Sequence, residues 1–188
     1  KELAKSASAW KIVIYPNKIT EEATREQLAQ KLAPVLVEKD ENGKYTPEDL
    51  GEMKESIREK AAMSSYGYLV LKSRVEKDVR DEIATLMTED KVTSEGEETK
   101  ISKFIAIESD VKRYYPYGTF ASTVIGFTGT EDIGRSGLEL RYNSDLTGTS
   151  GRIVSAVNGG SSNEKMPVEY ETIYAAKQGT SLVTTLDE

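Results

Sequence analysis

Four glycines within one short stretch constrain this chain more than any other local feature. The segment Gly134–Gly151 reads GRSGLELRYNSDLTGTSG, and its glycines bracket a short amphipathic segment with one carboxylate, Glu139, in its first turn. Because glycine has no Cβ, it permits left-handed backbone and the close approach of another chain segment. We therefore expect a short helix that packs tightly where segments of the chain cross.

The spacing inside this stretch predicts how the helix begins and ends. Ser136 and Glu139 have the spacing of a capping box, in which each side chain bonds the backbone amide of the other residue. Gly148 is expected to be the left-handed residue that ends the helix. Three side chains recur at four-residue intervals and would share one helix face: Leu138, Tyr142 and Leu146.

The rest of the chain mixes strand and helix patterns without a regular βαβ rhythm, which favours the α+β class. The expected strands are 9–16, 66–73, 103–109, 152–157, 166–176 and 179–187, the last three antiparallel around a turn at 158–160. The expected helices are 20–39, 46–62, 73–87 and 119–126, with a polar loop at 93–99.

Capping residues predict where the longer helices begin. Thr20 precedes two glutamates, Thr46 precedes a proline at the first helical position, and Ser73 with Glu76 forms another capping-box pattern. Pro34 is expected to kink or end the first helix, because proline removes a backbone donor.

Composition excludes several classes of function. The 188 residues carry a net charge of −7, which argues against nucleic acid or an anionic membrane surface as a partner. With no cysteine and no histidine, disulfides, thiol catalysis, histidine relays and the usual transition-metal ligands are also excluded. No apolar run approaches the roughly 20 residues that span a bilayer.

A serine–lysine nucleophile is the one covalent chemistry that this composition readily supports. The S-x-x-K spacing occurs at Ser8/Lys11, Ser109/Lys112 and Ser162/Lys165, but no K-[ST]-G follows. The glycines form no phosphate-binding loop, and Asp40–Gly43 lacks most ligands of a calcium loop, so a β-turn is expected there. We expect no catalytic, cofactor-binding or metal-binding residues. The tyrosines around Pro116 are expected to pack against the sheet, with a carbohydrate or peptide platform as the alternative.

Two stretches taken together resemble the N-terminal, non-penicillin-binding module of class B penicillin-binding proteins, also called the pedestal or dimerisation domain. The segment RYYPYGTFASTVIG matches the R-x-Y-P-x-G…G signature, and GRSGLELRYNSDLTG matches G-x-x-G-x-E…L-x-G. Thr123 stands where the family often has histidine. The matching residues are Arg113, Tyr115, Pro116, Gly118, Gly126, Gly134, Gly137, Glu139, Tyr142, Leu146 and Gly148.

The resemblance implies a structural network in which Arg113 and Glu139 are partners. It further implies a non-catalytic module of a division- or sporulation-type D,D-transpeptidase on the extracytoplasmic face of the membrane. Both ends of the sequence are expected to be internal to a longer chain, with a membrane anchor before residue 1 and the transpeptidase domain after residue 188. Implied partners are that domain, a SEDS-type glycosyltransferase, other cell-wall synthesis proteins and a second copy of the chain.

The same resemblance implies a largely antiparallel pedestal with an inserted helical lobe. Residues 1–15 and 103–188 would form the pedestal core, and residues 16–102 the lobe. Two alternatives stay open at this stage: a stand-alone serine–lysine acyl-transfer or β-lactam-binding enzyme, and an extracellular adhesin-like module.

Overall fold

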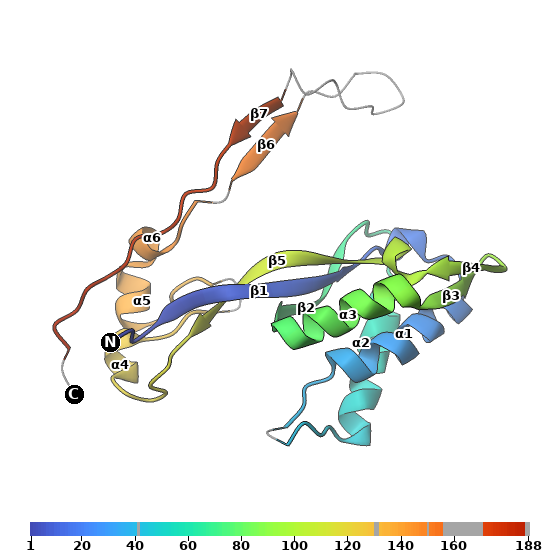
Figure 1. Cartoon of the computed structure of the whole chain (residues 1–188), viewed down its shortest axis with the longest axis horizontal. Coiled ribbons are helices and arrows are strands. Elements are labelled where there is room, and N and C mark those ends of the chain that lie inside the picture. The colour runs from blue at the N-terminus through green and yellow to red at the C-terminus, as the bar shows by residue number, and fades with distance from the viewer. Residues whose placement is uncertain (41, 130–131, 150, 156–170, 187–188) are drawn as a thin grey trace. The chain divides into compact units, whose positions relative to one another are not determined.

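The computed structural model describes residues 1–40, 42–129, 132–149, 151–155 and 171–186. It is a mixed α+β fold with antiparallel strand pairs, as predicted. The chain divides into two compact units (Figure 1). Unit 1 comprises Lys1–Lys5 and Arg113–Glu188, and unit 2 comprises Ser6–Lys112.

Unit 2 is built on a three-stranded sheet with the strand order β2-β1-β5. Its strands are β1 (Lys5–Ile14), β2 (Leu69–Val75) and β5 (Ile105–Tyr114), of which β1 and β5 cross the unit boundary by one or two residues. Its helices are α1 (Glu22–Leu36), α2 (Pro47–Ala62) and α3 (Lys77–Glu89), which gather on one side of the sheet in Figure 1. Short 3-10 turns lie at Pro16–Lys18 and Ile101–Lys103.

One continuous apolar core holds unit 2 together. Alternate residues of β1, Ile12 and Ile14, face the core, as the period-two geometry of a strand requires. Leu28, Leu32 and Leu36 of α1 join them at four-residue spacing, and all five of these side chains are fully buried. Phe104, Ile57 and Ile83 bring the other elements into the same cluster.

The predicted helix starts were right at one position and wrong at two. Thr46 caps α2 as expected, in a complete reciprocal box with Asp49. The cap of α1 is Glu21 rather than Thr20, and that of α3 is Glu76 rather than Ser73, and neither makes a side-chain capping bond. Ser73 lies within β2, because the pairing of this strand with β1 continues to Val75.

The helix α1 ends three residues before the expected end at Lys39 but does not stop at Pro34. It contains Pro34 and continues to Leu36, and the amide of Val37 still bonds the carbonyl of Ala33. The proline lies in the last turn of the helix. The two residues that follow it, Val35 and Leu36, pack into the core and so stabilise the helical conformation there. Lys72 of β2 donates to the Leu36 carbonyl at 2.5 Å and so satisfies a group that the helix end exposes.

The polar stretch 93–99, expected to be a loop, is instead part of a β-hairpin. Strands β3 (Lys91–Ser94) and β4 (Glu97–Lys100) pair antiparallel around Glu95 and Gly96, which have φ values of 54° and 77°. Two left-handed residues are the signature of the tight turn that suits hairpin twist. The Thr93 amide donates to the side-chain oxygen of Gln27, and the Thr24 hydroxyl donates to the Thr93 carbonyl. Side chains of α1 therefore bond the backbone of β3.

Unit 1 contains short elements. They are α4 (Ser122–Ile125), α5 (Gly137–Arg141), α6 (Asn143–Leu146) and the antiparallel strands β6 (Arg152–Ser155) and β7 (Glu171–Tyr174). Helix α4 ends at Gly126 as predicted. The strand expected over 179–187 is wrong, since no strand is present over the described residues 179–186. Val183 in this segment is 94% exposed. The expected turn at 158–160 lies outside the described residues.

Burial separates the two units sharply. Within the described part of unit 1, Ile125 is the one buried hydrophobic side chain, whereas unit 2 contains all the others. Unit 1 instead exposes large apolar side chains: Val124, Phe127, Ile133, Leu140, Val154, Ile173, Leu182, Val183 and Leu186. The boundaries between the two units lie between residues 5 and 6 and between residues 112 and 113. The division into a pedestal core and an inserted helical lobe stays a prediction.

Candidate functional site

The candidate site is the network of signature residues in unit 1. At its centre, Arg113 at the end of β5 meets Glu139 of α5. The guanidinium atoms Nε and Nη2 each lie 2.9 Å from Oε1 of Glu139. The two side chains are only 18% and 6% exposed, so the ion pair is largely shielded from water. The expected proximity of these two residues is confirmed.

The expected capping role of Glu139 is wrong. Ser136 is the N-cap of α5, but no side-chain capping bond forms there. The carboxylate is oriented toward Arg113 instead, and a charge-assisted bond to a guanidinium is roughly twice as strong as a bond between neutral groups. Glu139 therefore joins β5 to α5 rather than stabilising its own helix.

The glycines of the signatures let α4 and α5 cross backbone to backbone. Gly126 has a φ of 80° and Gly137 a φ of 56°, a region that side chains of L-residues rarely adopt. A Cβ on Gly126 would stand 1.9 Å from the Ser136 carbonyl oxygen, and one on Gly137 would stand 2.3 Å from the Val124 carbonyl oxygen. Only glycine fits at either position. This crossing is the packing that the sequence predicted.

Asn143 completes the network and was missed at the sequence level. Its carboxamide oxygen accepts a bond from the Gly134 amide at 2.8 Å and another from the Thr147 hydroxyl. The signal was available, because asparagine side chains bond nearby backbone groups at turns and helix ends. Gly134 itself packs against the Glu139 carbonyl, which a Cβ would approach to 2.0 Å.

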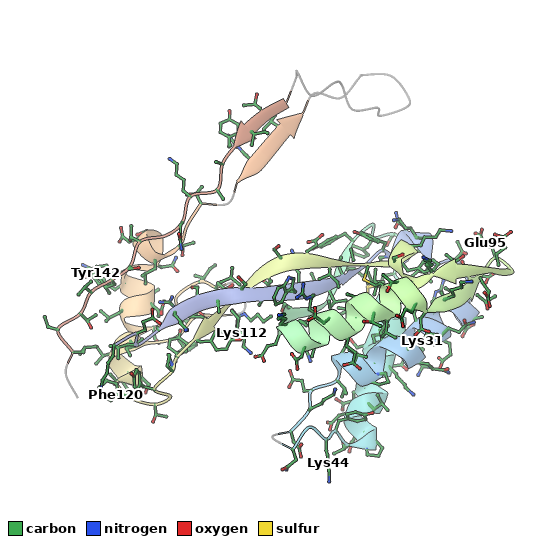
Figure 2. The ribbon with its side chains drawn as sticks, viewed as in Figure 1. Lys31, Lys44, Glu95, Lys112, Phe120 and Tyr142 are labelled. Atoms are coloured by element: carbon green, nitrogen blue, oxygen red, sulfur yellow. The ribbon has the colours of Figure 1, made fainter. Side chains whose placement is uncertain are left out.

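The single helix expected over residues 138–146 is instead two short helices. Tyr142, with a φ of −109°, separates α5 from α6, although backbone bonds of helical spacing still join Leu138 to Tyr142 and Tyr142 to Leu146. Tyr142 is 37% exposed and is labelled in Figure 2. Gly148 follows the C-cap Thr147, but it is not among the glycines with positive φ, so it does not adopt the left-handed conformation expected of it.

The remaining signature residues form the turn after β5. Tyr115 accepts a bond from the Thr128 amide through its hydroxyl, and its own carbonyl accepts the Gly118 amide across Pro116. Tyr117 packs edge-on against Phe120 (labelled in Figure 2), with the Lys1 ammonium 5.8 Å from its ring centroid. These contacts use the tyrosines for packing.

The serine–lysine pairs do not form catalytic dyads where the structure describes them. Ser8 and Lys11 lie in β1, and residues three apart in a strand point to opposite faces. Lys11 hydrogen-bonds with Tyr68 and Glu108, which raises the pKa of its ammonium, the opposite of what a general base needs. Ser109 and Lys112 share β5, and Lys112 pairs with Glu76 at 2.6 Å. Ser162 and Lys165 lie outside the described residues.

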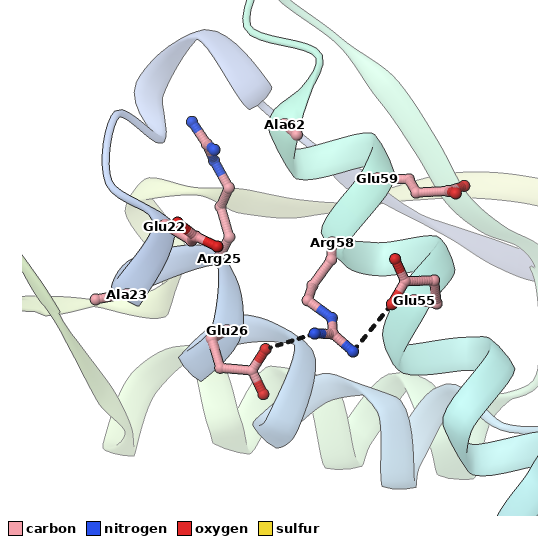
Figure 3. Close-up of a pocket in the computed structure, with 8 residues that line it drawn as sticks. All are labelled: Glu22, Ala23, Arg25, Glu26, Glu55, Arg58, Glu59 and Ala62. Atoms are coloured by element: carbon pink, nitrogen blue, oxygen red, sulfur yellow. Dashed lines mark ion pairs between the residues drawn. The ribbon is translucent and has the colours of Figure 1, made fainter.

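A groove of about 470 Å³ lies between α1 and α2 in unit 2 (Figure 3). Arg58 bridges Glu26 of α1 and Glu55 of α2 at 3.1 and 2.9 Å. None of its described lining residues carries a hydroxyl group. The described lining residues are Glu22, Ala23, Arg25, Glu26, Glu55, Arg58, Glu59 and Ala62. Across the described ranges, no three carboxylates gather as they would around a metal ion.

Both signature stretches lie inside a region that matches a known protein family. The family model described as the penicillin-binding protein dimerisation domain matches residues 1–184. Stage V sporulation protein D of Bacillus subtilis is 34% identical over 85 residues, which cover 45% of this chain and 13% of that protein. Peptidoglycan D,D-transpeptidase FtsI of Buchnera aphidicola is 31% identical over 77 residues, covering 41% of this chain and 13% of that protein.

A solved structure of similar fold is penicillin-binding protein PBP2 of Helicobacter pylori in complex with MreC. It has a TM-score of 0.58 at 14% identity and covers 95% of this chain and 31% of that one. The matched part of the chain spans about an eighth of the length of the two curated relatives. None of the helices in the described ranges is long and apolar enough to cross a membrane. From its signature network and the family match, this chain belongs to the penicillin-binding protein dimerisation domain family.

Proposed function

We propose that this chain is the non-catalytic pedestal of a peptidoglycan D,D-transpeptidase of the class B penicillin-binding protein type. It positions a catalytic domain that follows it in the parent protein and offers surfaces to other cell-wall synthesis proteins. The parent is anchored in the membrane and acts on its extracytoplasmic face. The signature residues, centred on Arg113 and Glu139, act as structural elements of the pedestal.

The observation that carries this proposal is the imbalance of burial in unit 1. Its described part buries one large hydrophobic side chain, Ile125, and exposes Phe127 at 57% and Leu140 at 55%. Burying apolar surface is worth about 25 cal/mol per Å², so a partner that covers these side chains would gain stability from each of them. A following catalytic domain is the partner that the family relationship suggests.

Further partners follow from the relatives. A relative of similar fold forms a complex with MreC, and this supports a partner of that kind for the present chain. A SEDS-type glycosyltransferase and a second copy of the chain belong to the same proposal.

The positioning role is tested by mixing this chain with the separately produced downstream domain and measuring binding by titration calorimetry. Phe127→Glu and Leu140→Glu, which place charge on the exposed apolar surface of unit 1, are expected to weaken binding. Tyr66→Glu is the matched control, because Tyr66 is also 54% exposed but belongs to unit 2. Equal binding by all three variants and the wild type would contradict the proposed use of this surface.

The alternative of an acyl-transfer enzyme is tested with fluorescent penicillin. The proposal predicts no covalent labelling of this chain and clear labelling of the parent. Labelling of the isolated chain would establish the alternative.

A further inference from the structure

The hairpin β6–β7 is longer than its two strands. Arg152 pairs with Tyr174 at its described base, and the isolated bridge between Thr149 and Lys177 continues the pairing in the same register. Thr149 and Lys177 exchange both backbone hydrogen bonds, at 2.8 and 2.9 Å. Antiparallel pairing in one register is therefore present at Thr149 and again over Arg152–Ser155.

The base of this ribbon is locked by glycines on both strands. A Cβ on Gly179 would stand 1.9 Å from the Leu146 carbonyl oxygen, and one on Gly148 would stand 2.3 Å from the Lys177 carbonyl oxygen. The Thr180 amide and hydroxyl both donate to the Asp145 carbonyl, at 2.8 and 2.9 Å. The segment 177–180 is thus fixed against α6 and its C-terminal turn.

Backbone contacts dominate this junction. Ala175, Ala176 and Lys177 are exposed, and Leu182 and Val183 further along are 38% and 94% exposed. An isolated two-stranded ribbon is at best marginally stable in water. Close glycine packing and four hydrogen bonds therefore hold the segment 177–180 in place.

We propose that this junction, hereafter the glycine clamp (residues 145–149 and 177–180), is a mechanical coupling element. It sets the direction in which the chain leaves unit 1 and thereby aligns the domain that follows. The inference rests on the proposed function, because it assigns the positioning role to specific residues. It also explains why the second signature ends in Leu146 and Gly148: Gly179 packs against the Leu146 carbonyl, and Gly148 packs against the Lys177 carbonyl.

The test uses the full-length parent in cells that have no other copy of it. Gly179→Ala places a methyl group against the Leu146 carbonyl and opens the clamp. Labelling of the parent by fluorescent penicillin is expected to stay within about twofold of wild type, since the catalytic domain is untouched. Cross-linking of new peptidoglycan, measured by muropeptide analysis, is expected to fall by on the order of tenfold to a hundredfold, because ångström-scale misplacement carries costs of that size.

A disulfide restores the clamp in the same background. The described chain has no cysteine to interfere, and Thr149→Cys with Lys177→Cys joins two directly paired residues. The oxidised triple variant is expected to regain cross-linking, and a reducing agent is expected to abolish that rescue. The matched control is Gly51→Ala, because a Cβ on Gly51 meets nothing within 4 Å.

Each outcome has one meaning. Normal cross-linking by Gly179→Ala, or no rescue by the disulfide, overturns the clamp. An unlabelled wild-type parent overturns the proposed function instead. If Gly179→Ala itself is not labelled, Lys177→Pro decides in the same assays, because it removes a clamp hydrogen bond without adding atoms at the glycine crossing. Loss of labelling in that variant as well would make the clamp a folding requirement only and overturn the coupling role.

Discussion

The two units of this chain achieve a defined structure by different means. Unit 2 buries a continuous core in which Phe104, Leu32 and Ile57 are at most 1% exposed. The described part of unit 1 relies on a shielded ion pair, glycine crossings and backbone hydrogen bonds. The difference indicates that hydrophobic burial stabilises unit 2, whereas a few polar contacts and close backbone packing stabilise the described part of unit 1.

The largest expected effect compares the same substitution in the two units. Phe104→Ala empties a fully buried site in unit 2 and is expected to cost about 3–5 kcal/mol of unfolding free energy. Phe127→Ala in unit 1, where the ring is 57% exposed, is expected to cost under about 0.5 kcal/mol. Urea denaturation followed by circular dichroism and by Trp10 fluorescence measures both. Similar costs for the two variants would refute the contrast in burial.

The ion pair gives the next largest effect. Glu139→Ala removes the carboxylate that pairs with the largely shielded Arg113. We expect this substitution to lower the free energy of unfolding by about 3 kcal/mol, the lower end for a buried pair, because Arg113 is partly exposed to solvent. Glu98→Ala breaks the exposed pair with Lys91, whose side chains are 50% and 74% exposed, and should cost under about 1 kcal/mol. A thermal midpoint of Glu139→Ala that equals that of Glu98→Ala would mean that the network is not what holds unit 1.

The glycines of the two units should respond with opposite signs. Gly126→Ala forces a Cβ into left-handed backbone and into the Ser136 carbonyl, so we expect a loss of at least about 1–2 kcal/mol. Gly51→Ala lies inside α2 with open space around it and should gain about 0.5–1 kcal/mol. Melting curves decide, and a stabilising Gly126→Ala would remove the crossing from the account.

The smallest effect concerns the cap that unit 2 has and unit 1 lacks. Hydrogen bonds from the Thr46 hydroxyl and amide lower the pKa of Asp49 below its ordinary 3.8. Since the folded pKa is depressed, the stabilising contribution is complete above about pH 4 and is lost as the pH falls through the lower folded value. Thr46→Ala should move the pKa of Asp49 upward in an NMR titration. An unchanged pKa would show that the capping box does not form in solution.

These two capping patterns show what sequence can and cannot predict. Thr46 and Asp49 have the same spacing as Ser136 and Glu139, yet only the first pair forms a box. The second is overridden because Arg113, 26 residues away in sequence, captures the carboxylate. Local spacing cannot anticipate a competitor that only the tertiary fold brings near.

Elements with a strong apolar period were predicted well, and those set by pairing were not. The helix α2 appears as expected, and β5 begins within the strand expected over 103–109 but continues to Tyr114. The β3–β4 hairpin was missed, since its strands are short and polar and their order depends on Gln27 and Thr24 of α1. The sequence predicted that glycines would allow chain segments to pack closely. It did not predict which segments meet, above all the packing of Gly179 against Leu146, which only the structure shows.

The central claim is that unit 2 is self-sufficient and that unit 1 is completed by a partner. Amide hydrogen exchange, compared between the isolated chain and the full-length parent, tests it most directly. In the isolated chain, amides of β1 and α1 should exchange slowly, and those of α5 and of the glycine clamp much faster. In the parent, protection of α5 and the clamp should rise while that of α1 stays unchanged. Equal protection of the two units in the isolated chain, with no gain in the parent, would contradict the account.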